Sequence, residues 1–181
     1  MPISSHAILP YIVEEVLKVQ PKKVLDVGIG HGIYGALIFN YASTLLPQVP
    51  KLIGIEPWEP YNNHLWEVYD EVHLKPLQEF KTKHIFDLII MADVIEHMKL
   101  NTGHLQISRC KKMLSPGGVM IISTPAIFQP QGAYMGNVYE EHKSLWDGRL
   151  FKMHGFRPVP TYKTLFGEQM LIYKFKQEER Q

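Results

Sequence analysis

Residues 24–35 read VLDVGIGHGIYG, an apolar run that ends at Asp26 and passes into glycines at positions 28, 30, 32 and 35. Another apolar run follows at 36–39. The two runs and the glycines between them predict a buried strand, a tight turn and the start of a helix. Glycines let the backbone take positive φ and approach a ligand closely, and the first N–H groups of a helix are unsatisfied donors. Four glycines in eight residues exceed what an ordinary strand-to-helix turn needs. We therefore expect a nucleotide-like ligand here.

Residues 30–35 also match the G-x-G-x-x-G fingerprint of dinucleotide sites, and Glu56 lies about 20 residues further on, where a ribose-binding acid is expected. The position of Asp26 argues against that interpretation. In a dinucleotide turn the first glycine directly follows the apolar strand, and an acid at this point would repel a pyrophosphate. An NAD-binding oxidoreductase is kept as an alternative.

Read as hydrophobic-hydrophobic-Asp-x-Gly-x-Gly-x-Gly, residues 24–32 resemble motif I of the class I S-adenosylmethionine-dependent methyltransferases. The cofactor of that family carries an ammonium and a sulfonium but no phosphate, so an acid suits it. The resemblance implies that the cofactor is bound by Asp26, Gly28, Ile29, Gly30 and Gly32.

A second strand is expected at residues 51–56, with Glu56 at its carboxyl end. There its two oxygens are placed to accept hydrogen bonds from both ribose hydroxyls, although a solvated acid or a helix cap is the alternative. Gly54 to Pro57 resembles the second family motif, which implies that Pro57 or Trp58 flanks the adenine. Trp58 is equally compatible with a packing role.

A weak third strand is expected at 72–74, followed by KPLQE at 75–79, where family members often carry an acid. The backbone of Leu77 is the cofactor contact that the resemblance implies at this point.

Residues 86–97 read FDLIIMADVIEH, an apolar run typical of a buried parallel strand followed by a polar Asp-x-x-Glu-His segment. The segment resembles the motif after the fourth strand of small-molecule and quinone-type O-methyltransferases. The resemblance implies that Ala92 and Asp93 lie beside the methionine part of the cofactor. Glu96 and His97 are expected either to orient the substrate or to cap the next helix.

The remaining elements follow from periodicity and turn signals. We expect a packing helix within residues 1–20, a short helix at 61–69, a helix at 105–114, and a helix capped by Asp147 that ends at His154. The turn at 114–118 resembles the third family motif and precedes a strand to residue 125. Final strands are expected at 156–160 and 169–175, the latter as an antiparallel edge strand, before a polar tail at 176–181.

Residues 126–146 have little regular pattern but carry several amide, aromatic and acidic side chains, which favours a substrate loop over disorder. His142 and His97 are candidate general bases because imidazole titrates near neutral pH, and Glu141 is a candidate for polarising the nucleophile. In the alternative interpretation Trp146 anchors the next helix in the core and the other side chains are solvated.

The 181 residues are expected to form one domain, and the formal charge of +1 gives no electrostatic reason to expect nucleic acid. The one cysteine, Cys110, excludes an internal disulfide and a cysteine-based zinc site, and we expect no metal. No apolar run approaches membrane-spanning length, and no signal peptide is apparent, which favours the cytoplasm. The oligomeric state is left open.

The motifs occur in family order along nearly the whole chain. The resemblance implies a doubly wound, seven-stranded, mostly parallel sheet with an antiparallel last strand and helices on both faces. It implies methyl transfer from S-adenosylmethionine to a small-molecule acceptor, with S-adenosylhomocysteine as product. A non-catalytic domain that binds the cofactor or a partner remains a further alternative. A nucleic-acid methyltransferase is also left open, although Asp93 to Glu96 replaces the expected Pro-Pro-aromatic segment and no proline precedes Cys110.

Overall fold

The computed structural model describes residues 5–160 and 170–178. The expected start of the first helix, residue 169 of the last strand and the end of the tail lie outside these residues. The helices in the described part are α1 (Leu9–Val19), α2 (Ile33–Leu45), α3 (Leu100–Lys112) and α4 (Gly148–Met153). The strands are β1 (Lys23–Val27), β2 (Lys51–Ile55), β3 (Glu71–His73), β4 (Phe86–Ala92), β5 (Leu114–Pro125), β6 (Arg157–Val159) and β7 (Met170–Lys176).

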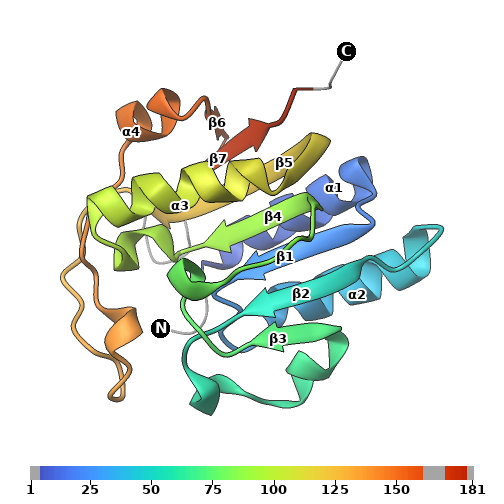
Figure 1. Cartoon of the computed structure of the whole chain (residues 1–181), viewed down its shortest axis with the longest axis horizontal. Helices are drawn as coiled ribbons and strands as arrows, with labels where there is room; N and C mark the ends of the chain where they lie inside the picture. The colour runs from blue at the N-terminus through green and yellow to red at the C-terminus, as the bar shows by residue number, and fades with distance from the viewer. Residues whose placement is uncertain (1–4, 161–169, 179–181) are drawn as a thin grey trace.

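In the described residues the strands form one sheet in the order β3-β2-β1-β4-β5-β7-β6 (Figure 1). The strands β1 to β5 pair in parallel, and β7 runs antiparallel to β5. The predicted mostly parallel sheet with an antiparallel last strand is therefore confirmed. The parallel strands all end at the same side of the sheet, where ligands bind in doubly wound folds.

One detail of the prediction is wrong, because β7 is not an edge strand. The short strand β6 pairs with its outer side and forms the edge instead. Ile172 and Tyr173 are both buried although they are neighbours and point to opposite faces. The alternation of polar and apolar residues in β7 suggested an edge strand. The strand is instead covered on both faces near its middle.

Helices cover both faces of the sheet, as predicted. Figure 1 shows α3 in front of the sheet and α1 and α2 behind it. Within β4, Ile89 and Met91 pack with residues of α3, whereas Leu88 and Ile90 pack with residues of α1 and α2. The continuous apolar run of β4 follows from this burial on both faces.

Two local predictions differ from the structure. The single helix expected at 61–69 is two 3₁₀ turns, η2 (Glu59–Tyr61) and η3 (His64–Val68). Asn63 separates them, and its side chain accepts a 2.8 Å hydrogen bond from the N–H of Leu65. Asparagine side chains compete in this way with continued helix.

The turn expected at 114–118 is part of β5, where a register shift opposite Phe86 and Leu88 accommodates it. Gly117 there has φ of +76°, which a residue with a side chain rarely adopts. The short 3₁₀ turns η1 (His6–Ile8), η4 (Leu77–Glu79), η5 (Ile95–His97) and η6 (Val138–Glu140) complete the described elements. None of the helices described has both the length and the apolar character that crossing a bilayer requires.

Candidate functional site

A pocket of about 220 Å³ lies at the carboxyl ends of β1, β2 and β4. Its far wall comes from the segment after β5, which Figure 1 shows in orange beyond the arrowheads of the parallel strands. Of the residues predicted to bind the cofactor or to act in catalysis, eight line this pocket: Gly28, Gly30, Glu56, Pro57, Leu77, Ala92, Asp93 and His97. The topology therefore brings together motifs that are far apart in the sequence.

Glu56 joins the glycine turn to the end of β2. Its carboxylate accepts hydrogen bonds of 3.0 Å from the N–H of Gly30 and 3.0 Å from the N–H of Trp58. The carbonyl of Gly30 in turn accepts a 2.8 Å hydrogen bond from the indole of Trp66. Gly30 has φ of +50°, and its backbone is fixed from both sides at the wall of the pocket.

Asp26 does not line the pocket. Its buried carboxylate accepts a 2.6 Å hydrogen bond from the hydroxyl of Tyr69, and that hydroxyl accepts a 3.1 Å hydrogen bond from the N–H of Gly35 at the start of α2. Direct contact with the cofactor was expected, but the side chain lies under the glycine turn. Its geometry supports the turn and the first residues of α2 instead.

Three further predicted cofactor residues are absent from the pocket wall. Ile29 is buried in the core between the sheet and the helices α1 and α2, and Trp58 packs against the same core. Gly32 is the N-cap of α2, with φ of +83°, and a Cβ there would lie 3.0 Å from the ring of Trp66. These residues therefore belong to the core and to the start of α2, and not to the wall of the pocket.

Burial raises the pKa of two carboxyl groups beside the turn. The pKa of Asp26 rises to about 7, against the opposing hydrogen bond from Tyr69. The pKa of Glu56 also rises to about 7, because desolvation outweighs the N–H groups of Trp58 and Gly30. Both groups hold their protons more tightly in the folded chain than in the unfolded chain.

Asp26 and Glu56 are therefore expected to stabilise the ligand-free protein near pH 4, and this contribution is lost as pH rises towards 7. The folded state binds more protons than the unfolded state in this window, so deprotonation favours unfolding. Urea denaturation between pH 4 and pH 8 measures the effect. Glu56→Gln should flatten the dependence and Glu59→Gln, at an exposed position of η2, should not. An unchanged slope in Glu56→Gln would contradict the assignment.

Asp93 stands at the end of β4 with φ of +53°, an uncommon conformation for a residue with a side chain. Its carboxylate accepts hydrogen bonds of 2.6 Å from the hydroxyl of Ser123 and 3.1 Å from the N–H of Ser5. Strained backbone of this kind concentrates at functional sites, where the surroundings enforce it. Here it turns the chain so that Asp93 and the following η5 border the pocket.

Several residues of the pocket wall are not among those predicted. Glu140 is buried, and one of its oxygens accepts a 2.9 Å hydrogen bond from the hydroxyl of Tyr61. That hydroxyl accepts a 3.2 Å hydrogen bond from the amide of Asn137. The sequence signal was weak, because Glu140 and Glu141 are adjacent acids in a segment without periodicity. Gln78 and Met98 also line the pocket, each next to or near a residue that was predicted.

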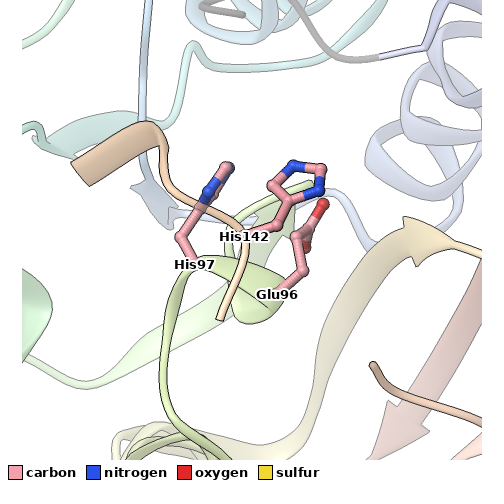
Figure 2. A group of neighbouring side chains, drawn as sticks. All are labelled: Glu96, His97 and His142. Carbon is pink, nitrogen blue, oxygen red and sulfur yellow. The ribbon is translucent and has the colours of Figure 1, made fainter. Parts of the chain in front are cut away.

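The three candidate catalytic residues are placed differently from one another. His97 lines the pocket and His142 does not, although the centroids of the two rings are only 4.9 Å apart. Figure 2 shows the two rings side by side, with the carboxylate of Glu96 next to the ring of His142. Glu141 does not line the pocket; its carboxylate pairs with Lys143 at 3.6 Å, and its carbonyl lies 3.2 Å from Nδ1 of His97. Burial lowers the pKa of His97 to about 4, and the nearby His142 adds to this against the opposing charge of Glu140.

Trp146 is a core residue, as the alternative interpretation held. Its side chain is 0% exposed, and its indole donates a 2.9 Å hydrogen bond to the hydroxyl of Ser144. The N–H groups of Lys143 and Ser144 both donate to the carbonyl of Glu96, at 2.8 and 3.1 Å. The loop at 126–146 is thus attached to η5 and to the core beside α3.

Tyr139 and Lys143 have the Tyr-x-x-x-Lys spacing of one familiar type of hydride-transfer site, and both line the pocket. In that type of site a helix places both side chains on one face. Here η6 ends at Glu140 and the chain continues extended. The Nζ of Lys143 lies 3.6 Å from the carboxylate of Glu141 and 3.4 Å from the carbonyl of Val138, and among the described residues no hydrogen bond joins it to the Tyr139 hydroxyl.

The chain matches the family model described as a methyltransferase domain over residues 6–165. It therefore belongs to this family, and its sheet is that of the class I S-adenosylmethionine-dependent methyltransferases. The order of strands, the glycine turn after β1 and the acid after β2 agree with that assignment.

Individual relatives are distant. The chain is 31% identical over 104 residues to the ubiquinone biosynthesis O-methyltransferase of Agrobacterium fabrum, which covers 56% of this chain and 40% of the relative. It is 28% identical over 135 residues to the enzyme of the same name from Glaesserella parasuis, and this match covers 70% of this chain and 54% of the relative. The chain thus spans about half the length of the curated relatives it matches.

Among solved structures, the fold is similar to that of the 1,6-didemethyltoxoflavin-N1-methyltransferase of Burkholderia thailandensis, with a TM-score of 0.66. That protein was crystallised with 1,6-didemethyltoxoflavin and S-adenosylhomocysteine. The sequence identity is 18%, and the match covers 96% of this chain and 79% of the other.

Proposed function

We propose that this chain transfers the methyl group of S-adenosylmethionine to a small-molecule acceptor. The observation that carries the proposal is the composition of the pocket wall. On one side lie the glycine turn, the end of β2 and the end of β4; on the other lies the segment at 137–143. One side has the features that suit the cofactor, and the other presents aromatic and polar groups that suit an organic acceptor.

The charges of the pocket support a cationic ligand over a dinucleotide. Among the described lining residues, Glu56, Asp93 and Glu140 are acids and Lys143 is the one lysine or arginine. Such a wall attracts an ammonium and a sulfonium and repels a pyrophosphate. Gly28 is required here by packing, because a Cβ there would overlap the side chain of Val94.

Within this proposal, Glu56 accepts hydrogen bonds from the ribose hydroxyls, and Pro57 and Leu77 border the adenine. Gly28, Gly30, Ala92 and Asp93 border the methionine part. Asp26, Ile29, Gly32 and Trp58 hold the turn in position from behind. When bound, the cofactor supplies an activated methyl group, so the chain contributes mainly proximity, orientation and exclusion of water.

The acceptor side is formed by Met98, Asn137 and Tyr139 together with His97. By their names, one relative is an O-methyltransferase of ubiquinone biosynthesis and the similar solved structure is an N1-methyltransferase of 1,6-didemethyltoxoflavin. We propose a small aromatic acceptor that presents an oxygen nucleophile, held against the ring of Tyr139. His97 and His142 remain the candidates for receiving a proton if the nucleophile arrives protonated.

Incubation of the purified protein with methyl-labelled S-adenosylmethionine and fractions of small metabolites tests the proposal. Transfer of label to a low-molecular-weight product is the expected result. Tight binding of the cofactor without transfer to any fraction would favour the alternative of a non-catalytic binding domain.

Glu56→Ala is expected to weaken binding of S-adenosylhomocysteine by about 1.5–3 kcal/mol, the typical contribution of hydrogen bonds to a charged group. Titration calorimetry measures the change. Glu59→Ala removes an exposed acid three residues away and should leave the affinity unchanged. Because Glu56 also holds Gly30 and Trp58, near-ultraviolet circular dichroism should confirm that the variant is folded. Equal affinities for the two variants would remove Glu56 from the site.

A further inference from the structure

Glu96, His97 and His142 form a cluster at the acceptor end of the pocket (Figure 2). Each offers one potential ligand atom, and these atoms all lie within 4.8 Å of one another. Two of the residues come from η5 and the third from the loop after β5. We propose that the cluster binds a divalent transition-metal ion, in contrast to the expectation from the sequence that no metal is bound.

The two imidazoles are fixed in the orientation that metal binding requires. Nδ1 of His142 lies 2.6 Å from the carbonyl of Gln129, and Nδ1 of His97 lies 3.2 Å from the carbonyl of Glu141. A carbonyl oxygen only accepts hydrogen bonds, so Nδ1 is the protonated nitrogen in each ring. Nε2 of each neutral ring therefore carries the free lone pair. Histidines that bind metals are usually held by such a hydrogen bond on the other nitrogen.

The carboxylate of Glu96 has a matching environment. It is buried, and one oxygen accepts a 3.2 Å hydrogen bond from the hydroxyl of Thr124. Within residues 5–160 and 170–178, no ion pair joins this carboxylate to a lysine, an arginine or a histidine. Burying a carboxylate without a paired charge is costly, and a bound cation would supply that charge.

The backbone keeps the three side chains together. The N–H groups of Lys143 and Ser144 donate to the carbonyl of Glu96, which joins the His142 segment to η5. Trp146, fully buried four residues after His142, anchors the same segment. The cluster is therefore preorganised by hydrogen bonds and packing that do not involve the ligand atoms themselves.

The donor set indicates which ions fit. Two imidazole nitrogens and one carboxylate oxygen suit Zn²⁺, Mn²⁺, Co²⁺ or Fe²⁺, whereas Mg²⁺ and Ca²⁺ prefer all-oxygen sites. Three protein ligands leave at least one coordination position open. Because His97 lines the pocket, that position faces the space proposed for the acceptor.

The role of the ion follows if the proposed methyl transfer is correct, and this part rests on that function. An acceptor hydroxyl bound at the open position loses its proton to water more readily, as metal-bound oxygens do. Its oxygen then forms the bond to the methyl carbon while the carbon–sulfur bond breaks and its electron pair goes to sulfur. The two histidines would serve as ligands in place of acting as general bases.

Titration of chelator-treated protein with Mn²⁺, Co²⁺ and Zn²⁺, and separately with Mg²⁺, tests the site. Calorimetry is expected to give one site per chain for the transition metals, and Co²⁺ should show a visible absorption band. His142→Ala should weaken binding at least tenfold, and Glu96→Gln should do the same. His142 is only partly buried, so its variant stays interpretable if the buried Glu96 variant does not fold.

His104→Ala is the matched control, because His104 belongs to a separate histidine pair in which its Nδ1 lies 2.7 Å from Nε2 of His154. It should leave the affinity of the cluster unchanged. Absence of binding, binding of Mg²⁺ alone, or equal affinity in His142→Ala would each overturn the proposal. S-adenosylhomocysteine is titrated into the same samples without metal. Metal binding without cofactor binding would count against the proposed function alone. Cofactor binding without metal binding would count against the metal site alone.

Discussion

Gly30→Val is expected to lower the affinity for S-adenosylhomocysteine at least a hundredfold, or by about 2.7 kcal/mol, while the chain stays folded. Gly30 has φ of +50°, lines the pocket, and is bonded through its N–H and carbonyl to Glu56 and Trp66. A β-branched side chain strongly disfavours that conformation and would enter the space of the ligand. Titration calorimetry on the two proteins measures the loss.

Gly155→Val is the control that distinguishes the effect of backbone strain on stability from the loss of cofactor binding. Gly155 follows α4 with φ of +77°, a Cβ there would meet the ring of Phe175 at an ordinary 3.6 Å, and the residue does not line the pocket. Its valine variant should lose stability but keep its affinity for the cofactor. Normal binding by Gly30→Val, or an equal loss in both variants, would show that Gly30 is not at the cofactor.

Trp146→Ala is expected to lower the free energy of unfolding by about 3–5 kcal/mol, the usual cost of removing a large buried aromatic side chain. Trp146 is 0% exposed and packs beside the rings of His104 and Phe151, at centroid distances of 5.0 and 5.5 Å. It also lies against Gly103, where a Cβ would overlap its ring. Urea denaturation measures the effect.

Leu145→Ala is the control, since Leu145 is 43% exposed and its truncation should change stability by no more than about 0.5 kcal/mol. Trp146→Phe retains part of the packing and keeps a folded sample for binding measurements. A loss below about 1 kcal/mol in Trp146→Ala would show that this side chain does not anchor the loop.

The fold could be predicted from the sequence because its main elements have strong local signals. The apolar run of β4 and the glycine turn after β1 are compatible with few other structures. Motif order then placed the ends of β1, β2 and β4 at one edge, and this is where the pocket lies. The helix capped by Asp147 was also predicted. The carboxylate of Asp147 caps it by accepting hydrogen bonds from the N–H groups of Arg149 and Leu150.

The finer structure of the site depended on tertiary contacts that periodicity does not encode. Asp26 was expected at the ligand, but Tyr69, from a segment predicted as helix, takes its carboxylate. In the loop at 126–146, two adjacent acids gave no indication which one faces inward, and the buried one is Glu140. His97 and His142 were identified separately, and only the path of the chain brings them together with Glu96.

The central claim is that this pocket binds S-adenosylmethionine, and calorimetric titration of the purified protein with S-adenosylhomocysteine and, in parallel, with NAD tests it most directly. The acid-rich wall formed by Glu56, Asp93 and Glu140 predicts one site per chain for S-adenosylhomocysteine and no measurable heat with NAD. Saturable binding of NAD together with no binding of S-adenosylhomocysteine would contradict the account.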